Sequence, residues 1–468
     1  MKETEALFSV LKQSAEPACA AAIEDAVARA LDRDLCRINA VDFAAKHGLD
    51  EERAIATFLH ATRLGLFEMS WNVLCPGCGG VLDASSTLKT LTRDEYDCRL
   101  CAAGYKPTLD EMVEVTFTVS PRVRRIAGHS PDTLPEVEYY RQIFWGSGVD
   151  LPDALQDSLA EFTVDSIELA AGEKAVLSVQ LPNEFIILFD PVTHSTQFID
   201  VKGEPVRERQ SLSMVFNNLA TPTGTVELRP GPLRLSLENL TDRRVLPALW
   251  IAADRLHNLL GRRKPFLTAK RLLTNQTFRD IFRTDTLDVD QRLKITSLTF
   301  LFTDLRGSTA LYQRVGDLAA YDLVRQHFGV LYEIVAAETG AVVKTIGDAV
   351  MATFLTPDRA LKAALRMREA MTRINAERRN EDLLLKIGIH EGPCLAVTLN
   401  NTQDYFGQTV NMAARVQGLA SSRAILATKP VVENLEVARI LESSGLQPTM
   451  QQAALRGIAE DTSVYVIP

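Results

Sequence analysis

Two acidic turns, 44 residues apart, constrain the fold of this chain more than any other feature. Asp304 follows a run rich in apolar and β-branched residues at 295–302, and Asp348 follows a second such run at 341–346. If the two runs form neighbouring strands, their carboxylates converge where an apolar core could not accept them. Paired carboxylate oxygens suit Mg²⁺, and two such cations can act on a phosphate ester. The pattern predicts a two-cation site, although either turn alone would also fit a solvated strand end.

Gly307, Ser308 and Thr309 lie between the two turns and open a helix. Free N–H groups at a helix start, together with the helix dipole, bind phosphate oxygens. We therefore expect these three residues to contact a phosphate group close to the two carboxylates.

From about Leu298 onward, the chain resembles the catalytic domain of class III nucleotidyl cyclases across nearly all of the remaining sequence. The resemblance rests on three blocks, which read FTDLRGST at 302–309, KTIGDAVMATF at 344–354 and DYFGQTVNMAARV at 404–416. It implies a ferredoxin-like α/β catalytic domain. It also implies that Asp304 and Asp348 hold two Mg²⁺ or Mn²⁺ ions in each active site.

The third block places Asn411 and Arg415 four residues apart, and hence on one face of a helix. The resemblance implies that Asn411 orients the ribose and that Arg415 neutralises charge on the phosphoryl group during cyclisation. It also places Arg456 against the distal phosphates, at a position where the family usually has Lys. The alternatives are a surface ion pair for Arg415 and a misfit inside the helix for Asn411, since Asn is a poor helix former.

The identity of the base follows from the same resemblance. In the family, a Lys and an Asp at the positions of Lys344 and Asp404 read adenine, whereas a guanine site has Glu and a small donor there. We therefore expect an adenylate cyclase that converts ATP to cyclic AMP and pyrophosphate, with a guanylate cyclase as the alternative. Family sites lie between two domains, so one catalytic domain per chain implies a homodimer with two equivalent sites.

Four cysteines form two C-x₂-C pairs with 19 residues between them, at Cys75, Cys78, Cys98 and Cys101. This spacing matches the zinc-ribbon pattern, in which four thiolates close a structural Zn²⁺ site. The alternative is two unrelated thiol pairs, one of them redox-active. A disulfide framework is not indicated, because four of the seven cysteines gather in this one cluster.

Residues 39–71 suggest a winged helix-turn-helix, with Asn39 and Asp50 as helix caps and Gly48 between the helices. DNA-binding versions present basic residues on the second helix, but here this helix opens with acidic residues at 50–52. We therefore favour an interaction or spacer role, with a DNA-binding regulator carrying a degenerate cyclase domain as the alternative. The order of segments resembles the N-terminal region found on some bacterial class III cyclases, and it leaves a regulatory ligand or protein partner open.

Short alternating segments between residues 113 and 238 indicate a β-sandwich, and a helix-rich linker follows. The basic run at 261–265 is interpreted as a solvated face of that linker. The predicted fold is multidomain α+β. Its domains are a winged-helix-like domain at 1–72, a zinc ribbon at 73–110, a sandwich-like domain at 111–250, a helical linker or transducer at 251–294 and a cyclase domain at 295–468.

Composition limits the partners and the compartment. The net charge of −9 does not favour nucleic acid as a partner. The sequence contains no apolar run of the length that a membrane span needs. Residues 1–5 are polar and lack the apolar core of a signal peptide, so we expect a cytoplasmic protein.

Overall fold

The computed structural model describes residues 2–91, 93–217, 224–282, 292–380, 382–399, 402–421, 423–455 and 462–468. Arg456 lies outside these residues, and so does the side chain of Thr309. The chain forms two compact units. The first contains most of residues 1–267, and the second contains residues 268–468 with short segments around Leu88 and Leu109. Each unit is described by itself below.

The described part of the first unit begins with five short helices, and capping side chains begin the last two of them. They are α1 (Lys2–Ser14), α2 (Pro17–Arg29), η1 (Asp32–Leu35), α3 (Ala40–His47) and α4 (Glu51–Arg63). The side chain of Asn39 accepts two backbone N–H groups at the start of α3, and α3 ends at Gly48, whose φ is +63°. Asp50 caps α4. These residues act as the sequence predicts, because each satisfies backbone groups that a helix end leaves unpaired.

A three-stranded antiparallel sheet packs against α4. Its central strand β1 (Phe67–Leu74) pairs with β2 (Val81–Ser85) and with β5 (Val113–Val119). Phe58 of α4 contacts Phe67 and stacks on Phe117, with ring centroids 5.4 and 5.0 Å apart. The strand at 113–119 is therefore present but joins β1, whereas the sequence grouped it with the later β-rich segments. Alternation identifies a strand without identifying its partner.

The cysteine pairs and a set of short helices share one core. The short elements around this core include β3 (Tyr96–Cys98), β4 (Ala103–Tyr105), α5 (Glu136–Tyr139), the π-helical turn η5 (Tyr140–Phe144), α6 (Leu155–Ala160) and α7 (Asp254–Gly261). Buried Trp145 and Trp250 belong to this core together with Cys75, Cys78 and Cys98. The cysteines of the two C-x₂-C pairs are thus part of the apolar interior of this unit.

Two further sheets also share a core. One has the order β10–β12–β7 and the other the order β11–β9–β8–β13–β6. Their strands are β6 (Thr163–Ser166), β7 (Lys174–Leu181), β8 (Phe185–Phe189), β9 (Thr196–Val201), β10 (Gln210–Phe216), β11 (Thr225–Leu228), β12 (Gly231–Asn239) and β13 (Ala248–Ile251). Leu235 of the first sheet and Leu188 of the second belong to the same buried cluster. On β12, buried residues alternate with more exposed ones, as in a sheet with one covered face.

The segment expected as one helical linker divides between the two units. Helix α7 packs into the first unit through Leu256 and Leu259. In the same unit, Lys264 of the basic run forms ion-pair contact with Asp42 at 3.2 Å. Helices α8 (Ala269–Leu273) and α9 (Gln276–Ile281) belong to the second unit. The basic run was predicted to be a solvated face of the linker, but one of its residues, Lys264, makes an ion pair within the first unit.

The second unit is a mixed sheet covered by helices on both faces. The sheet order is β15–β16–β14–β17–β19–β21–β20, and β18 pairs with β17. The strands are β14 (Leu293–Leu305), β15 (Ala341–Ile346), β16 (Ala349–Phe354), β17 (Leu385–Leu399), β18 (Thr402–Phe406), β19 (Ile425–Thr428), β20 (Thr449–Ala453) and β21 (Thr462–Ile467). The helices are α10 (Ser308–Val315), α11 (Asp317–Ala337), α12 (Pro357–Arg378), α13 (Gln408–Leu419), α14 (Lys429–Val432) and α15 (Leu435–Ser443).

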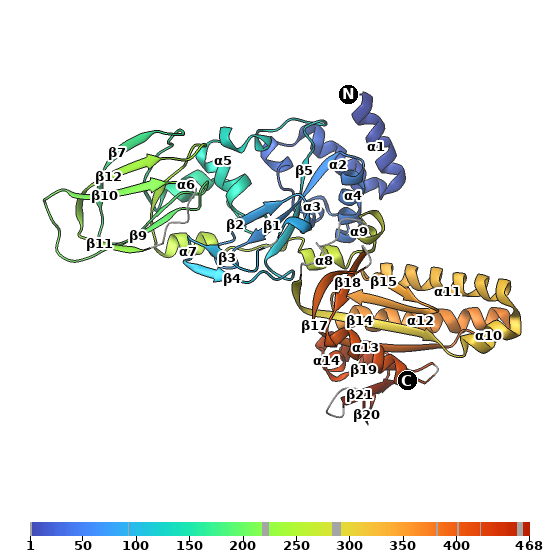
Figure 1. The fold of residues 1–468 in the computed structure, drawn as a ribbon. Helices are drawn as coiled ribbons and strands as arrows, with labels where there is room; N and C mark the ends of the chain where they lie inside the picture. The colour runs from blue at the N-terminus through green and yellow to red at the C-terminus, as the bar shows by residue number, and fades with distance from the viewer. Residues whose placement is uncertain are drawn as a thin grey trace. The chain divides into compact units, whose positions relative to one another are not determined.

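The faces of this sheet carry different helices. Figure 1 shows α11 and α12, in yellow and orange, extended alongside β14. These two helices share a core with Ile425 and Ala427 of β19. Leu426, between them, packs on the other face with Val416 of α13. The period of two along β19 therefore separates the two helical layers.

Candidate active site and cysteine cluster

The pairing of two strands brings Asp304 and Asp348 together. Asp304 lies near the end of β14, and Asp348 lies in the turn between β15 and β16, after Gly347 with φ of +64°. Antiparallel β14 and β16 align Thr303 with Val350, so both aspartates are at the same end of this strand pair. The sequence predicted this convergence from the two acidic turns.

The electrostatics of the two aspartates fit a cation site. Burial raises the pKa of Asp304, and the negative charge of Asp348 raises it further, while Lys386 opposes both effects. The Oδ2 atom of Asp348 is buried and has no hydrogen-bond partner among the described residues. Two hard oxygen ligands that repel each other, one of them unsatisfied, would be stabilised by a divalent metal ion.

The turn after β14 leads directly into α10. Gly307 has φ of +71°, and its carbonyl accepts the Leu311 N–H at the start of the helix. Ser308 is the first helical residue. Gly307 and Ser308 thus form the turn and the first residue of α10, shortly after Asp304 in the chain, and their contact with a phosphate stays a prediction.

Lys344 and Asp404, 60 residues apart in sequence, form a direct ion pair. Lys344 Nζ lies 2.5 Å from Asp404 Oδ2, and the two side chains are 41% and 8% exposed. Lys344 is on β15, four residues before Asp348. Asp404 is on β18, where its Oδ1 accepts the Tyr405 N–H. The strands thus bring a donor and an acceptor into direct contact within one chain. Asp404 pairs with Val397 next to the start of β14, so along the sheet Asp404 lies toward the opposite end from Asp304.

Asn411 and Arg415 occupy one face of α13. Thr409, Ala413 and Val416 bury the face of the helix that packs on the sheet, whereas Asn411 is exposed and Arg415 is half-buried. Within the described parts of the chain, no ion pair with Arg415 is found. The surface ion pair considered for Arg415 is therefore not found among these residues.

Two residues near the site carried no sequence signal. His327 of α11 is fully buried, and burial lowers its pKa to about 4, opposed by the negative charge of Asp348. Its neutral ring therefore lines the turn that carries Asp348. In the sequence, His327 falls on the apolar face of a helix, and this position does not distinguish a functional residue from an ordinary core residue.

The second of these residues is Arg279 of α9. Its Nη2 donates to the carbonyl oxygens of Gln403 at 2.8 Å and Val343 at 3.4 Å, and its guanidinium lies 6.0 Å from the Tyr405 ring centroid. Val343 and Gln403 immediately precede Lys344 and Asp404. A single linker side chain therefore ties together the two strands that carry this ion pair.

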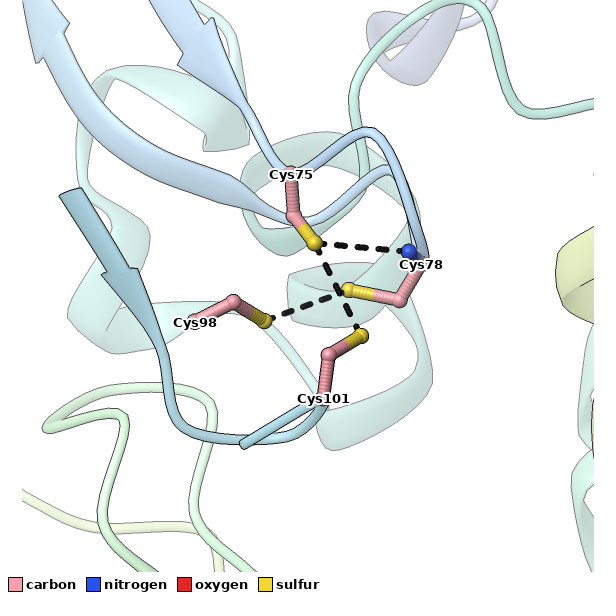
Figure 2. A group of neighbouring side chains, drawn as sticks. All are labelled: Cys75, Cys78, Cys98 and Cys101. Carbon is pink, nitrogen blue, oxygen red and sulfur yellow. Dashed lines mark hydrogen bonds between the residues drawn. The ribbon is translucent and has the colours of Figure 1, made fainter. Parts of the chain in front are cut away.

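The four cysteines in the C-x₂-C pairs converge to one point (Figure 2). All four Sγ atoms lie within 4.8 Å of one another, and two pairs, Cys75–Cys101 and Cys78–Cys98, are 3.6 Å apart. The backbone N–H groups of Cys78 and Gly80 point to the sulfur atoms of Cys75 and Cys78. Hydrogen bonding, from Cys101 foremost, lowers the pKa of the Cys75 thiol far below its usual range.

This geometry fits a tetrahedral metal site. Zn–S bonds of about 2.3 Å give S···S edges of about 3.8 Å in a regular tetrahedron, close to the two observed separations. Both pairs of neighbouring sulfurs join a cysteine of one C-x₂-C pair to a cysteine of the other. The two pairs therefore form one cluster, contrary to the alternative of unrelated thiol pairs.

Comparison with known families divides the chain at the same linker. Residues 1–280 match the model of a family of unknown function, DUF5939. The chain belongs to this family. Residues 291–467 match the adenylate and guanylate cyclase catalytic domain, so the DUF5939 region is followed by a cyclase domain of class III. Such domains use divalent metals, in agreement with the two aspartates.

Curated relatives match the cyclase part. An adenylate cyclase of Anabaena cylindrica is 29% identical over 36% of this chain and 36% of its own length. Adenylate cyclase 2 of Rhizobium meliloti is 30% identical over 29% of this chain and 41% of its own length. The chain thus spans about a third to two fifths of these relatives.

Solved structures match the same part. An adenylate cyclase from Trypanosoma brucei has a TM-score of 0.33 and 25% identity, covering 37% of this chain and 89% of that chain. The adenylyl cyclase CyaB from P. aeruginosa has a TM-score of 0.34 and 21% identity, covering 38% of this chain and 96% of that chain.

Among the described residues, no helix is long and apolar enough to cross a membrane.

Proposed function

We propose that this protein is an adenylate cyclase that converts ATP to 3′,5′-cyclic AMP and pyrophosphate. The observation that carries the proposal is the ion pair between Lys344 and Asp404, which β15 and β18 bring together within one chain. A lysine donor and a carboxylate acceptor match adenine, whose ring N1 accepts and whose amino group donates. Guanine presents the opposite pattern at these positions, and a mismatched polar site rejects a substrate strongly.

Each site residue of the cyclase domain has a separate role in the proposed reaction. The ribose 3′-oxygen attacks the α-phosphorus, the new O–P bond closes the ring, and the bond to the departing pyrophosphate breaks. Asp304 and Asp348 would hold two Mg²⁺ or Mn²⁺ ions, which when bound supply charge neutralisation on the triphosphate and favour loss of the 3′-hydroxyl proton. Asn411 orients the ribose, and Arg415 stabilises the negative charge that develops on the phosphoryl oxygens.

We assign the active form to a homodimer. Asn411 and Arg415 lie on the side of α13 that faces away from their own sheet, and no hydrogen bond or ion pair among the described residues links them to Asp304 or Asp348. A two-fold axis between two cyclase domains would bring these two residues of one chain to the carboxylates of the other. The first of these chains would also supply the further substrate contacts Lys344, Asp404 and Arg456. Both halves of each site then come from the same sequence.

A product assay with ATP or GTP and Mg²⁺ or Mn²⁺ tests the substrate. Wild-type protein should form cyclic AMP in preference to cyclic GMP. The double variant Lys344→Glu/Asp404→Cys should lose at least about tenfold in kcat/KM for ATP and gain use of GTP. Equal use of both nucleotides by the wild type, or an unchanged preference in the variant, would refute the assignment of the base.

We also propose that the four-cysteine cluster holds one structural Zn²⁺ per chain. Support comes from four sulfur atoms within 4.8 Å, three of them on buried residues. Four protein ligands close the coordination shell, so this ion would stabilise the fold and take no part in the cyclase reaction. The DUF5939 region would then serve as the regulatory part of the protein.

A further inference from the structure

The DUF5939 region contains a cavity of about 540 Å³ within the first unit. Its walls come from the end of α2, the residues around Arg37, helix α3, the π-helical turn η5 and the loop that contains Gly146 and Ser147. This volume lies in the range of small-molecule sites, roughly 300 to 1,000 Å³. The cavity is far along the chain from every residue assigned to the cyclase reaction.

Basic side chains outnumber acidic ones around this cavity. Its lining includes six arginine or lysine residues and four aspartates. Among the described residues, Asp25 pairs with Arg29 alone, at 3.1 Å. Two other carboxylates, those of Asp42 in the lining and Glu138 behind it, are each shared by two cations. Arg33 and Arg141 both approach Glu138 Oε1, at 3.9 and 3.7 Å, and Lys46 and Lys264 both approach Asp42 Oδ2, at 3.0 and 3.2 Å. One carboxylate between two cations neutralises only half of their charge.

Arg37 has an unusual backbone conformation. Its φ is +48°, in the left-handed region that long side chains rarely adopt. Hydrogen bonds hold it there, from its N–H to Thr118 Oγ1 and from its guanidinium to the Ile143 carbonyl. Among the described residues, no carboxylate forms an ion pair with Arg37. Strain of this kind is retained where the surrounding structure fixes a side chain for a purpose, often at a ligand clamp.

The wall next to Arg37 is also rigid. Glu114 is fully buried, and its Oε2 accepts from both the backbone N–H and the hydroxyl of Ser147, each at 2.9 Å. A Cβ on Gly146 would lie 2.6 Å from a Leu74 methyl carbon, so this loop fits closely against β1. These contacts hold the loop that forms one wall of the cavity, and a preorganised wall lowers the entropy cost of binding.

We propose that this cavity binds the phosphate group of a small anionic molecule. Two arginines, Arg33 and Arg141, are brought close together by Glu138. Arg37 adds a guanidinium that forms no ion pair with any described carboxylate, although the charge of buried Glu114 acts on it from behind the wall. A planar carboxylate is satisfied by one guanidinium fork, whereas a tetrahedral phosphate dianion accepts from several directions at once. Such a ligand would neutralise the excess charge and give the DUF5939 region a chemical input.

The test is calorimetric titration of the full-length, metal-loaded protein with inorganic phosphate at constant ionic strength, with chloride as the reference anion. The titration is done in the Arg415→Ala background, because the cyclase site is itself a phosphate site. We expect saturable binding in the millimolar range or tighter, as a ligand of this size allows. Arg37→Gln and Arg33→Gln should each weaken it at least tenfold.

Two controls keep the outcome clear. Arg124→Gln removes an arginine of the same unit that pairs with Asp32 at 2.8 Å and does not line the cavity, so phosphate binding should be unchanged. The contact found for Arg33 among the described residues is a 3.9 Å approach to Glu138, so Arg33→Gln should fold even if Arg37→Gln does not. Absence of saturable binding at about 10 mM phosphate would overturn the proposal. So would equal binding by Arg33→Gln and the parent.

Discussion

Removal of the metal from the cysteine cluster should unfold the DUF5939 region and leave the cyclase domain folded. The perturbation is either a strong chelator or the double variant Cys75→Ser/Cys98→Ser. Cys75 and Cys98 are 1% and 3% exposed and belong to the same core as Trp145 and Trp250. Loss of the ion would leave polar sulfur ligands facing one another in the middle of that core.

The expected effect is large. Structural zinc contributes about 10–16 kcal/mol of apparent binding free energy at neutral pH, which matches or exceeds the total stability of a typical domain, about 5–15 kcal/mol. Even if only about 5 kcal/mol of this is lost, a unit of this size should melt about 10–20 °C lower. We therefore expect the first unit to be unfolded or close to unfolding at 37 °C without its metal.

Tryptophan fluorescence gives a selective assay. All three tryptophans of the chain, Trp71, Trp145 and Trp250, are buried, and all belong to the first unit. Their emission should shift to longer wavelength as zinc is withdrawn. Nucleotide binding by the cyclase domain, measured in the same sample, should persist. Cys19→Ala, a buried cysteine of the same unit outside the cluster, serves as the matched control and should retain its zinc.

Three results would refute this reasoning. The first is protein purified without chelator that contains far less than one zinc per chain. The second is an unchanged emission spectrum after the metal is removed. The third is loss of nucleotide binding in step with the fluorescence change, which would show that the cyclase domain depends on the same metal.

Further predictions concern the cyclase domain. Asp348→Ala should abolish cyclic AMP formation without unfolding the protein, and retention of more than about a tenth of the activity would exclude a metal role. An equal mixture of Asp304→Ala and Arg415→Ala chains should recover about a quarter of wild-type activity, because half of the dimers are mixed and each mixed dimer holds one intact site of two. No recovery despite subunit exchange would exclude a site shared between chains. Arg279→Gln should raise the KM for ATP more than it lowers kcat and should weaken the preference over GTP, whereas Lys270→Met, which removes a linker ion pair, should do neither.

The sequence predicted local and motif-bound features well. Cysteine spacing is a local pattern, and the structure brings Cys75, Cys78, Cys98 and Cys101 together as expected. Asp304 and Asp348 converge because each ends a strand that the hydrophobic pattern already identified. The contact between Lys344 and Asp404 joins residues 60 positions apart, and only the family resemblance pointed to it.

Long-range pairing was beyond what the sequence could show. Val113–Val119 alternates as a strand, yet nothing in its residues selects β1 as its partner. Lys264 sits in a basic run typical of solvated linkers, but its ion pair with Asp42 depends on a segment more than 200 residues away. Arg279 was missed for the same reason, because its importance comes from two carbonyl oxygens on distant strands.

The ion pair between Lys344 and Asp404 affects how the nucleotide site binds a base, because it is already formed when no nucleotide is present. Asp404 is almost completely buried, and the lysine keeps it satisfied when no nucleotide is present. Under the proposed function, an entering adenine therefore exchanges one set of partners for another and gains little net binding free energy. A base of the wrong polarity would separate the pair and satisfy neither group. The strands would thus contribute selectivity to the enzyme, while most of the affinity would have to come from the triphosphate and its metal ions.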